Sequence, residues 1–157
     1  MLISGIANPA GETEGYNGLH LKDGEIDEII SGRQMIGIPV KIEHKGVGVG
    51  TVVSAFKDEQ GRLNCILDIT DDEIEGAIAQ QWVRDNTASE LSLGYTVDIN
   101  QSEPQGRLSA GRKKVLEVSL VRKGARKGCH IYSHPGKHPP GDPGLIKDWR
   151  EAFGHPF

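Results

Sequence analysis

Three short segments of the chain carry the side chains that acyl-transfer chemistry uses. Ile-Glu-His ends at His44, Leu-Ser-Leu-Gly-Tyr contains Ser92, and Leu-Glu-Val-Ser-Leu-Val contains Glu117. An imidazole can accept the proton of a serine hydroxyl and return it near neutral pH, and a carboxylate can orient that imidazole. Each residue lies within or at the end of a strand-like run, which can hold it rigidly. The three side chains are therefore candidates for a base, a nucleophile and an acid.

Ser92 and His44 also have simpler interpretations. Alternation places Leu91 and Leu93 on one face of their strand and Ser92 on the other, and we expect Gly94 to leave space for a substrate backbone. By pattern alone Ser92 is an ordinary serine in a strand, and it becomes a nucleophile only with a base within hydrogen-bond reach. His44 is expected to end a strand, where a partly exposed histidine is common, and five other histidines compete for the role of base.

Glu117 lies in an apolar strand, where a carboxylate is costly unless it has a partner. Alternation predicts that its neighbours Leu116, Val118 and Leu120 point into the core, with Glu117 on the opposite face. His44 is one candidate partner, because a carboxylate would fix its tautomer. The alternative is an ordinary ion pair with a nearby base, for which the candidates are Lys113, Lys114 and Arg122.

The turn of residues 122–129 has glycines on either side of a basic segment. Gly124 and Gly128 enclose Ala125, Arg126 and Lys127. Such a turn can aim backbone N–H groups at an anion and stabilise a developing oxyanion. A solvated basic turn is the alternative that composition favours.

The histidines after this turn do not form a zinc-binding pattern. Pro135 and Gly136 would interrupt the continuous helix that could align them, and no CxxC pair accompanies them. The glycine-rich segment 45–51 matches neither the GxGxxG nor the Walker pattern. We therefore expect no metal and no other cofactor. The residues considered as zinc ligands are Cys129, His130, His134 and His138.

The composition is that of one small, β-rich domain. The chain has 157 residues, enough for one core, and 21 glycines and 8 prolines favour turns over long helices. A net charge of −4 argues against nucleic acid and anionic membranes as partners, and no apolar stretch approaches the roughly 20 residues of a membrane span. Two cysteines are too few for a disulfide framework, and the N-terminus lacks the features of a secretory signal. We expect a soluble intracellular protein.

Hydrophobic patterning predicts strands around a central hairpin and three helices. Residues 49–69 are expected to form the hairpin. The capping-box pattern of residues 70–73 predicts the start of a helix, and Gly32 is expected to end another. The predicted strands lie within segments 1–23, 36–56, 63–69, 91–99 and 115–121. The apolar helix faces expected are Ile26, Ile29 and Ile30; Ile74, Ala77, Ile78 and Trp82; and Leu145, Ile146, Trp149 and Phe153.

The chain is expected to divide into one domain, a linker and a terminal helix. Residues 1–132 would form the β domain, and the Pro/Gly/His-rich segment 133–144 the linker. Residues 145–157 would form an amphipathic helix that packs on the same domain or on a partner subunit.

The three segments, in this order, resemble those of the viral capsid-maturation serine proteases. That family comprises the prohead proteases of tailed phages and the assemblins of herpesviruses, and the resemblance covers roughly residues 36–130. The phage branch is similar in its His before a Gly-Val hairpin strand, its nucleophile strand (here LSLGY) and its closing LEVSLV strand. The assemblins are similar in the glycine-framed basic turn, but have a second His where this chain has Glu117. The sequence looks intermediate between the two branches.

The resemblance implies a fold, a reaction and partners. The fold would be α+β, a mostly antiparallel β-barrel flanked by a few helices. Ser92 would be the nucleophile, His44 the base and Glu117 the acid, with the backbone of Ala125 and Arg126 forming the oxyanion hole. Substrates would be scaffold and major capsid proteins, and the enzyme itself, within a viral procapsid in the host cell. Assemblins work as dimers, so a homo-oligomer is expected. The alternative function is a catalytically inactive β-barrel assembly module of a procapsid.

Overall fold

The main structural element is a seven-stranded mixed sheet with the strand order β7-β8-β4-β5-β6-β1-β9. The computed structural model describes residues 1–9, 13–14, 20–21, 23–97, 113–124 and 128–134. Within these residues every neighbouring pair in the sheet is antiparallel except β4 and β8, which are parallel. The strands are β1 (Leu2–Asn8), β4 (Pro39–Ile42), β5 (Lys45–Lys57), β6 (Leu63–Ile69), β7 (Glu90–Val97), β8 (Lys113–Val121) and β9 (Ile131–Ser133); β2 (Thr13–Glu14) and β3 (His20–Leu21) pair separately.

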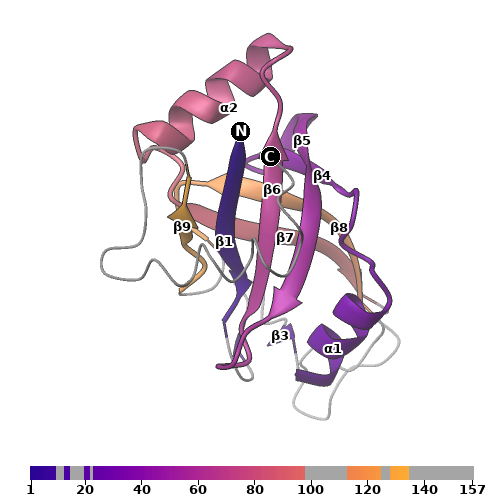
Figure 1. Ribbon diagram of the computed structural model, residues 1–157. Helices are drawn as coiled ribbons and strands as arrows, with labels where there is room; N and C mark the ends of the chain where they lie inside the picture. The colour runs from indigo at the N-terminus through magenta and orange to yellow at the C-terminus, as the bar shows by residue number, and fades with distance from the viewer. Residues whose placement is uncertain (10–12, 15–19, 22, 98–112, 125–127, 135–157) are drawn as a thin grey trace.

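The sheet curls so that its two edge strands, β7 and β9, come close to each other. In Figure 1, β1, β6 and β5 cross in front of β7 and β8. At the seam Glu90 and His130 form an isolated bridge, and the Ile131 N–H donates to the Ser89 carbonyl at 2.9 Å. The sequence predicts a β-barrel. The structure has a curled sheet, or half-barrel, in which a short contact joins the edge strand β7 to the segment that leads into β9.

One apolar core draws residues from every strand of this sheet and from both helices. Burying each large aliphatic side chain contributes about 1.5–3 kcal/mol to folding. Gly5 on β1 lets that strand approach β7 closely, because a Cβ there would press against the Leu91 side chain. The core thus holds the two halves of the curled sheet together, and with them the strands that carry the candidate site.

Helix α1 (Asp23–Ser31) confirms the first helix prediction. Ile26 and Ile29 are buried, and the helix ends before Gly32, whose N–H donates to the Glu28 carbonyl at 2.9 Å. Acidic residues in its first turn lie at the positive end of the helix dipole.

Helix α2 (Ile74–Arg84) lies where the sequence predicts it, but the predicted apolar face is wrong. Ile74 is 77% exposed and Ile78 46% exposed, whereas Ala79 and Val83 are fully buried. The helix packs on β5 and β6 through this other face.

Two contacts explain the rotation of α2. The Gln80 amide donates to the carbonyls of Ile69 and Thr70, both at 3.1 Å, so a polar side chain faces the sheet. Gly76 packs against the Thr70 backbone, where a Cβ would clash. The capping box does not form: Thr70 Oγ1 accepts a hydrogen bond from the Asp72 N–H, and Glu73 is the N-cap residue without a side-chain cap.

The predicted linker and terminal helix fall almost entirely outside the described residues. Strand β9 extends through Ser133, and segment 135–157 is not described. In the described part of the chain, neither helix has the length and apolarity that a membrane crossing requires.

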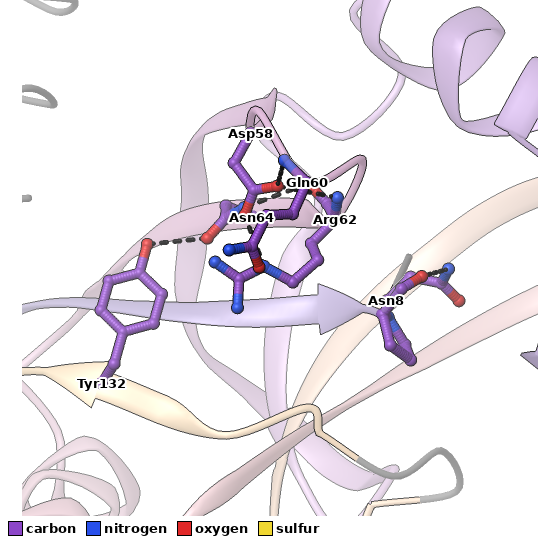
Figure 2. Close-up of polar contacts among 7 residues, drawn as sticks. Asn8, Asp58, Gln60, Arg62, Asn64 and Tyr132 are labelled. Atoms are coloured by element: carbon purple, nitrogen blue, oxygen red, sulfur yellow. Dashed lines mark hydrogen bonds and ion pairs between the residues drawn. The ribbon is translucent and has the colours of Figure 1, made fainter. Parts of the chain in front are cut away.

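The turn between β5 and β6 is organised by Asp58 (Figure 2). Its Oδ1 accepts the N–H groups of Gln60 and Arg62, both at 2.9 Å, and its Oδ2 accepts Arg62 Nε at 2.7 Å and Asn64 Nδ2 at 2.9 Å. The Tyr132 hydroxyl donates to Asn64 Oδ1 at 2.9 Å, which connects this turn to β9. Burial by itself raises the pKa of Asp58, but the hydrogen bonds from Asn64 and Arg62 outweigh it and lower that pKa below its usual range.

Asp58→Asn should destabilise the protein by about 1–3 kcal/mol at neutral pH, because hydrogen bonds to a charged acceptor are lost. The folded pKa of Asp58 is lowered, so its contribution is present above the unfolded pKa of about 3.9 and is lost as pH falls through the folded pKa. Urea unfolding of both chains from neutral pH down to about pH 3 should show the difference in stability shrinking. Asp27→Asn is the control. The Asp27 side chain is 62% exposed, so its ion pair with Lys57 contributes little to stability. A difference that stays constant with pH would contradict the assignment.

Candidate active site

His44 lies in a strained two-residue turn between β4 and β5. Ile42 pairs with Lys45, which leaves Glu43 and His44 at the centre of the turn with φ values of 51° and 61°. Two left-handed residues are typical of a type I′ turn, which favours Asn and Gly. For other residues this conformation costs roughly 1–2 kcal/mol each. The expectation that His44 ends a strand is therefore wrong: β4 ends at Ile42, and the turn directs the imidazole.

Three contacts with the end of β8 hold this turn. The Glu43 N–H donates to the Leu120 carbonyl at 3.0 Å, and the His44 N–H donates to Ser119 Oγ at 3.0 Å. Glu43 Oε1 accepts the Arg122 N–H at 2.9 Å. These contacts are available because β4 runs parallel to β8, which brings the end of each strand to the same place.

The pairing of β7 with β8 places Ser92 beside the same residues. Ser92 is opposite Ser119 and Gly94 is opposite Glu117. Alternate residues share a face, so these four side-chain positions form one patch across the two strands. Ser92 is 5% exposed and Glu117 8% exposed.

His44 connects Ser92 to Glu117. Its Nε2 lies 3.0 Å from Ser92 Oγ, and its Nδ1 is hydrogen-bonded to Glu117 Oε1. The ring side chain is 40% exposed and the carboxylate side chain 11% exposed, so the imidazole lies between solvent and a buried acid. The structure thus brings the three sequence-predicted side chains together, and it pairs Glu117 with His44 rather than with a Lys or Arg.

This arrangement can carry out proton transfer from a hydroxyl. With its proton on Nδ1 facing the carboxylate, the neutral imidazole presents an unprotonated Nε2 to Ser92. Nε2 can then accept the Ser92 proton, while the adjacent carboxylate stabilises the resulting imidazolium. The geometry is that of a general base with its hydroxyl nucleophile.

Gly94 is needed for a reason that differs from the expected one. The sequence predicts that this glycine leaves space for a substrate backbone, but Glu117 occupies that space. A Cβ built on Gly94 would overlap Glu117 Oε1. Gly94 therefore allows the carboxylate to lie against β7 and reach His44.

The predicted inward face of β8 is only partly correct. Val118 and Leu120 are fully buried, but Leu116 is 45% exposed. The pairing of β7 with β8 shifts register between Gly94 and Tyr95, and the shift leaves Leu116 without a partner. A β-bulge of this kind interrupts alternation, which a sequence pattern does not show.

Sequence reasoning missed Ser119 as part of the site. Its Oγ accepts the His44 N–H and donates to Glu117 Oε2 at 2.6 Å. The available signal was its position: Ser119 is two residues after Glu117, and in a strand it shares that residue's face.

The turn after β8 is described only in part. The Gly124 N–H donates to Glu90 Oε2 at 2.6 Å, and Gly128 has a left-handed φ of 86°. Ala125 and Arg126 lie outside the described residues, so the oxyanion hole stays a prediction. Among the residues that the structure does describe, no cluster of three or more His, Cys, Asp or Glu side chains could hold a metal.

Solved structures similar to this chain include those of a herpesvirus protease, although neither a protein-family model nor a curated protein matches the sequence. The protease of Kaposi's sarcoma-associated herpesvirus (KSHV), in complex with a hexapeptide phosphonate inhibitor, aligns with a TM-score of 0.55 and 17% identity. The alignment covers 85% of this chain and 65% of that protease, so this chain spans less than two thirds of its length. The same viral protease with an allosteric inhibitor aligns with a TM-score of 0.52 and 17% identity, over 83% of this chain and 73% of the other.

Likeness at this level of identity shows the fold. The two similar structures are of a herpesvirus protease, and the resemblance to tailed-phage prohead proteases stays a prediction from the sequence. The curled mixed sheet flanked by α1 and α2 is an assemblin-like fold.

Proposed function

We propose that this protein is a serine endopeptidase in which Ser92 is the nucleophile, His44 the general base and Glu117 the orienting acid. The observation that carries the proposal is the hydrogen-bonded series of hydroxyl, imidazole and carboxylate formed by these residues. They come from three strands or turns that are distant in the sequence and meet on one patch of an assemblin-like fold.

The reaction would proceed through an acyl-enzyme. His44 Nε2 accepts the proton of Ser92 as Oγ attacks the scissile carbonyl carbon, and the imidazolium then donates that proton to the leaving amine. In the second step His44 takes a proton from water as the water oxygen attacks the ester carbonyl carbon. The bond from that carbon to Ser92 Oγ then breaks, and the imidazolium returns the proton to Ser92 Oγ, which leaves the acid product and the free enzyme. Glu117 orients the imidazole and supports the imidazolium. The backbone N–H groups of Ala125 and Arg126 would bind the oxyanion, as the resemblance implies.

The proposed substrates are proteins of viral assembly. By resemblance they are scaffold and major capsid proteins and the enzyme's own chain, cut within a procapsid in the host cell, and the working form is a homodimer. The similar KSHV protease was solved with a hexapeptide phosphonate inhibitor, which supports a peptide as the ligand here. The His44 side chain is 40% exposed, so the base of the proposed site is open to solvent on one side.

A serine-directed phosphonate should react with the wild-type chain at Ser92, because His44 activates that hydroxyl. Intact-mass and peptide-mapping spectrometry would locate the adduct. Ser92→Ala should not react with the phosphonate and should not cut a co-expressed scaffold protein. Ser54→Ala, which changes another buried serine, should react and should cut the scaffold protein. Scaffold cleavage that persists in Ser92→Ala would refute the assignment. A folded wild-type chain that neither reacts nor cleaves would support the assembly module.

Glu117→Gln should lower the rate by about 10²–10⁴, because the amide keeps the shape but cannot support the imidazolium. Cleavage of a scaffold-derived peptide by the purified variant would measure the loss. Glu75→Gln, at an exposed position on α2, is the control for removal of a carboxylate. An unchanged rate in Glu117→Gln would return Glu117 to a structural role.

Gly94→Ala should lower the rate by about 10²-fold, because a methyl group there displaces the Glu117 carboxylate from His44 and small misplacements of catalytic groups are costly. The same peptide assay would measure the loss, with thermal unfolding to establish that the variant folds. Gly48→Ala is the matched control in β5, because its new Cβ would come no closer than 3.4 Å to another heavy atom. Equal rates for Gly94→Ala and Gly48→Ala would show that the new methyl group at position 94 does not displace the Glu117 carboxylate.

A further inference from the structure

Ser119 joins the base and the acid of the proposed site. It is fully buried on β8, directly opposite Ser92 in the strand pairing. Its Oγ lies 3.0 Å from the His44 backbone nitrogen and 2.6 Å from Glu117 Oε2. We propose that Ser119 is a positioning residue that fixes both the His44 turn and the Glu117 carboxylate. This inference rests on the proposed function and concerns the same site.

The chemistry of the two partners fixes the direction of both hydrogen bonds. A backbone N–H can only donate, so Ser119 Oγ accepts from His44. An ionised carboxylate can only accept, so the hydroxyl proton goes to Glu117. The Ser119 hydroxyl therefore accepts one hydrogen bond, from the His44 N–H, and donates another, to Glu117 Oε2.

The contact with His44 constrains a turn that is locally unfavourable. His44 has a left-handed φ of 61° and follows a residue with the same type of conformation. Such a backbone persists only when surrounding contacts determine it. Ser119 Oγ accepts the hydrogen bond of the His44 N–H, so loss of the hydroxyl removes this support of the His44 backbone.

The contact with Glu117 constrains the rotation of the carboxylate. The last torsion of a glutamate side chain is soft and has no sharp preference. Here the two oxygens have different partners, Oε1 with His44 and Oε2 with Ser119. The hydroxyl thus holds the carboxylate plane so that Oε1 faces Nδ1. Ser119 has no exposed surface through which bulk water could replace it.

Ser119→Ala should lower kcat about 10- to 100-fold with KM within about twofold of wild type, because it loosens reacting groups without touching the substrate. Ser119→Thr keeps the hydroxyl and should recover most of the rate. Ser4→Ala removes another buried strand serine, whose hydroxyl has no hydrogen-bond partner among the described residues, and should leave both constants unchanged. Peptide cleavage by the purified chains, with thermal unfolding in parallel, gives these values.

Proton NMR provides a measurement that does not depend on cleavage. The His44 Nδ1 proton, hydrogen-bonded to the Glu117 carboxylate, should appear far downfield, and this signal should be absent in Glu117→Gln. We expect Ser119→Ala to shift or broaden this signal and Ser119→Thr to keep it. A wild-type chain that shows the signal but cleaves nothing would refute the endopeptidase while still testing Ser119.

An unchanged Nδ1 signal in folded Ser119→Ala would overturn the proposal, whatever the rate. If Ser119→Ala does not fold, Ser119→Cys takes its place, because the thiol is a weak hydrogen-bond donor of similar shape. The same shift in signal and loss in kcat are then expected, and an unchanged signal would again overturn the proposal.

Discussion

The parallel pairing of β4 with β8 is the constraint on which the candidate site depends. In a sheet whose other described pairs are antiparallel, this one brings the end of β4 to the end of β8. The β4–β5 turn then meets Ser119, and β7, on the other side of β8, presents Ser92. Strand β8 is thus the common neighbour of the base and the nucleophile, and it carries the acid itself.

The left-handed turn at Glu43 and His44 shows how tertiary contacts override local preference. A two-residue turn of this type favours Asn and Gly, and neither is present. The conformation is supported instead by the Leu120 carbonyl and the Ser119 hydroxyl of β8 and by the Arg122 N–H just after it. A conflict between local sequence and global structure is expected at functional sites, and here it occurs at the proposed base.

The same reasoning separates what the sequence could predict from what it could not. Chemical type and order in the chain made His44, Ser92 and Glu117 candidates, which the structure brings together, and sequence patterns located α1, α2 and the strand at 63–69. The apolar face of α2 could not be predicted, because the buried amide of Gln80 bonds carbonyls at the end of β6. The outward turn of Leu116 depends on a register shift between two strands, and no single segment encodes it.

The cost of burying Glu117 and the geometry of the site have one physical origin. A carboxylate that is 8% exposed needs hydrogen-bond partners, because an unpaired buried charge is strongly unfavourable. Its partners are the His44 imidazole and the Ser119 hydroxyl, and Gly94 provides the space in which it reaches them. The contacts that make this charge tolerable in an apolar strand are therefore the same contacts that orient the imidazole toward Ser92. Stability of β8 and alignment of the three groups are coupled, so a change in Gly94 or Ser119 alters both.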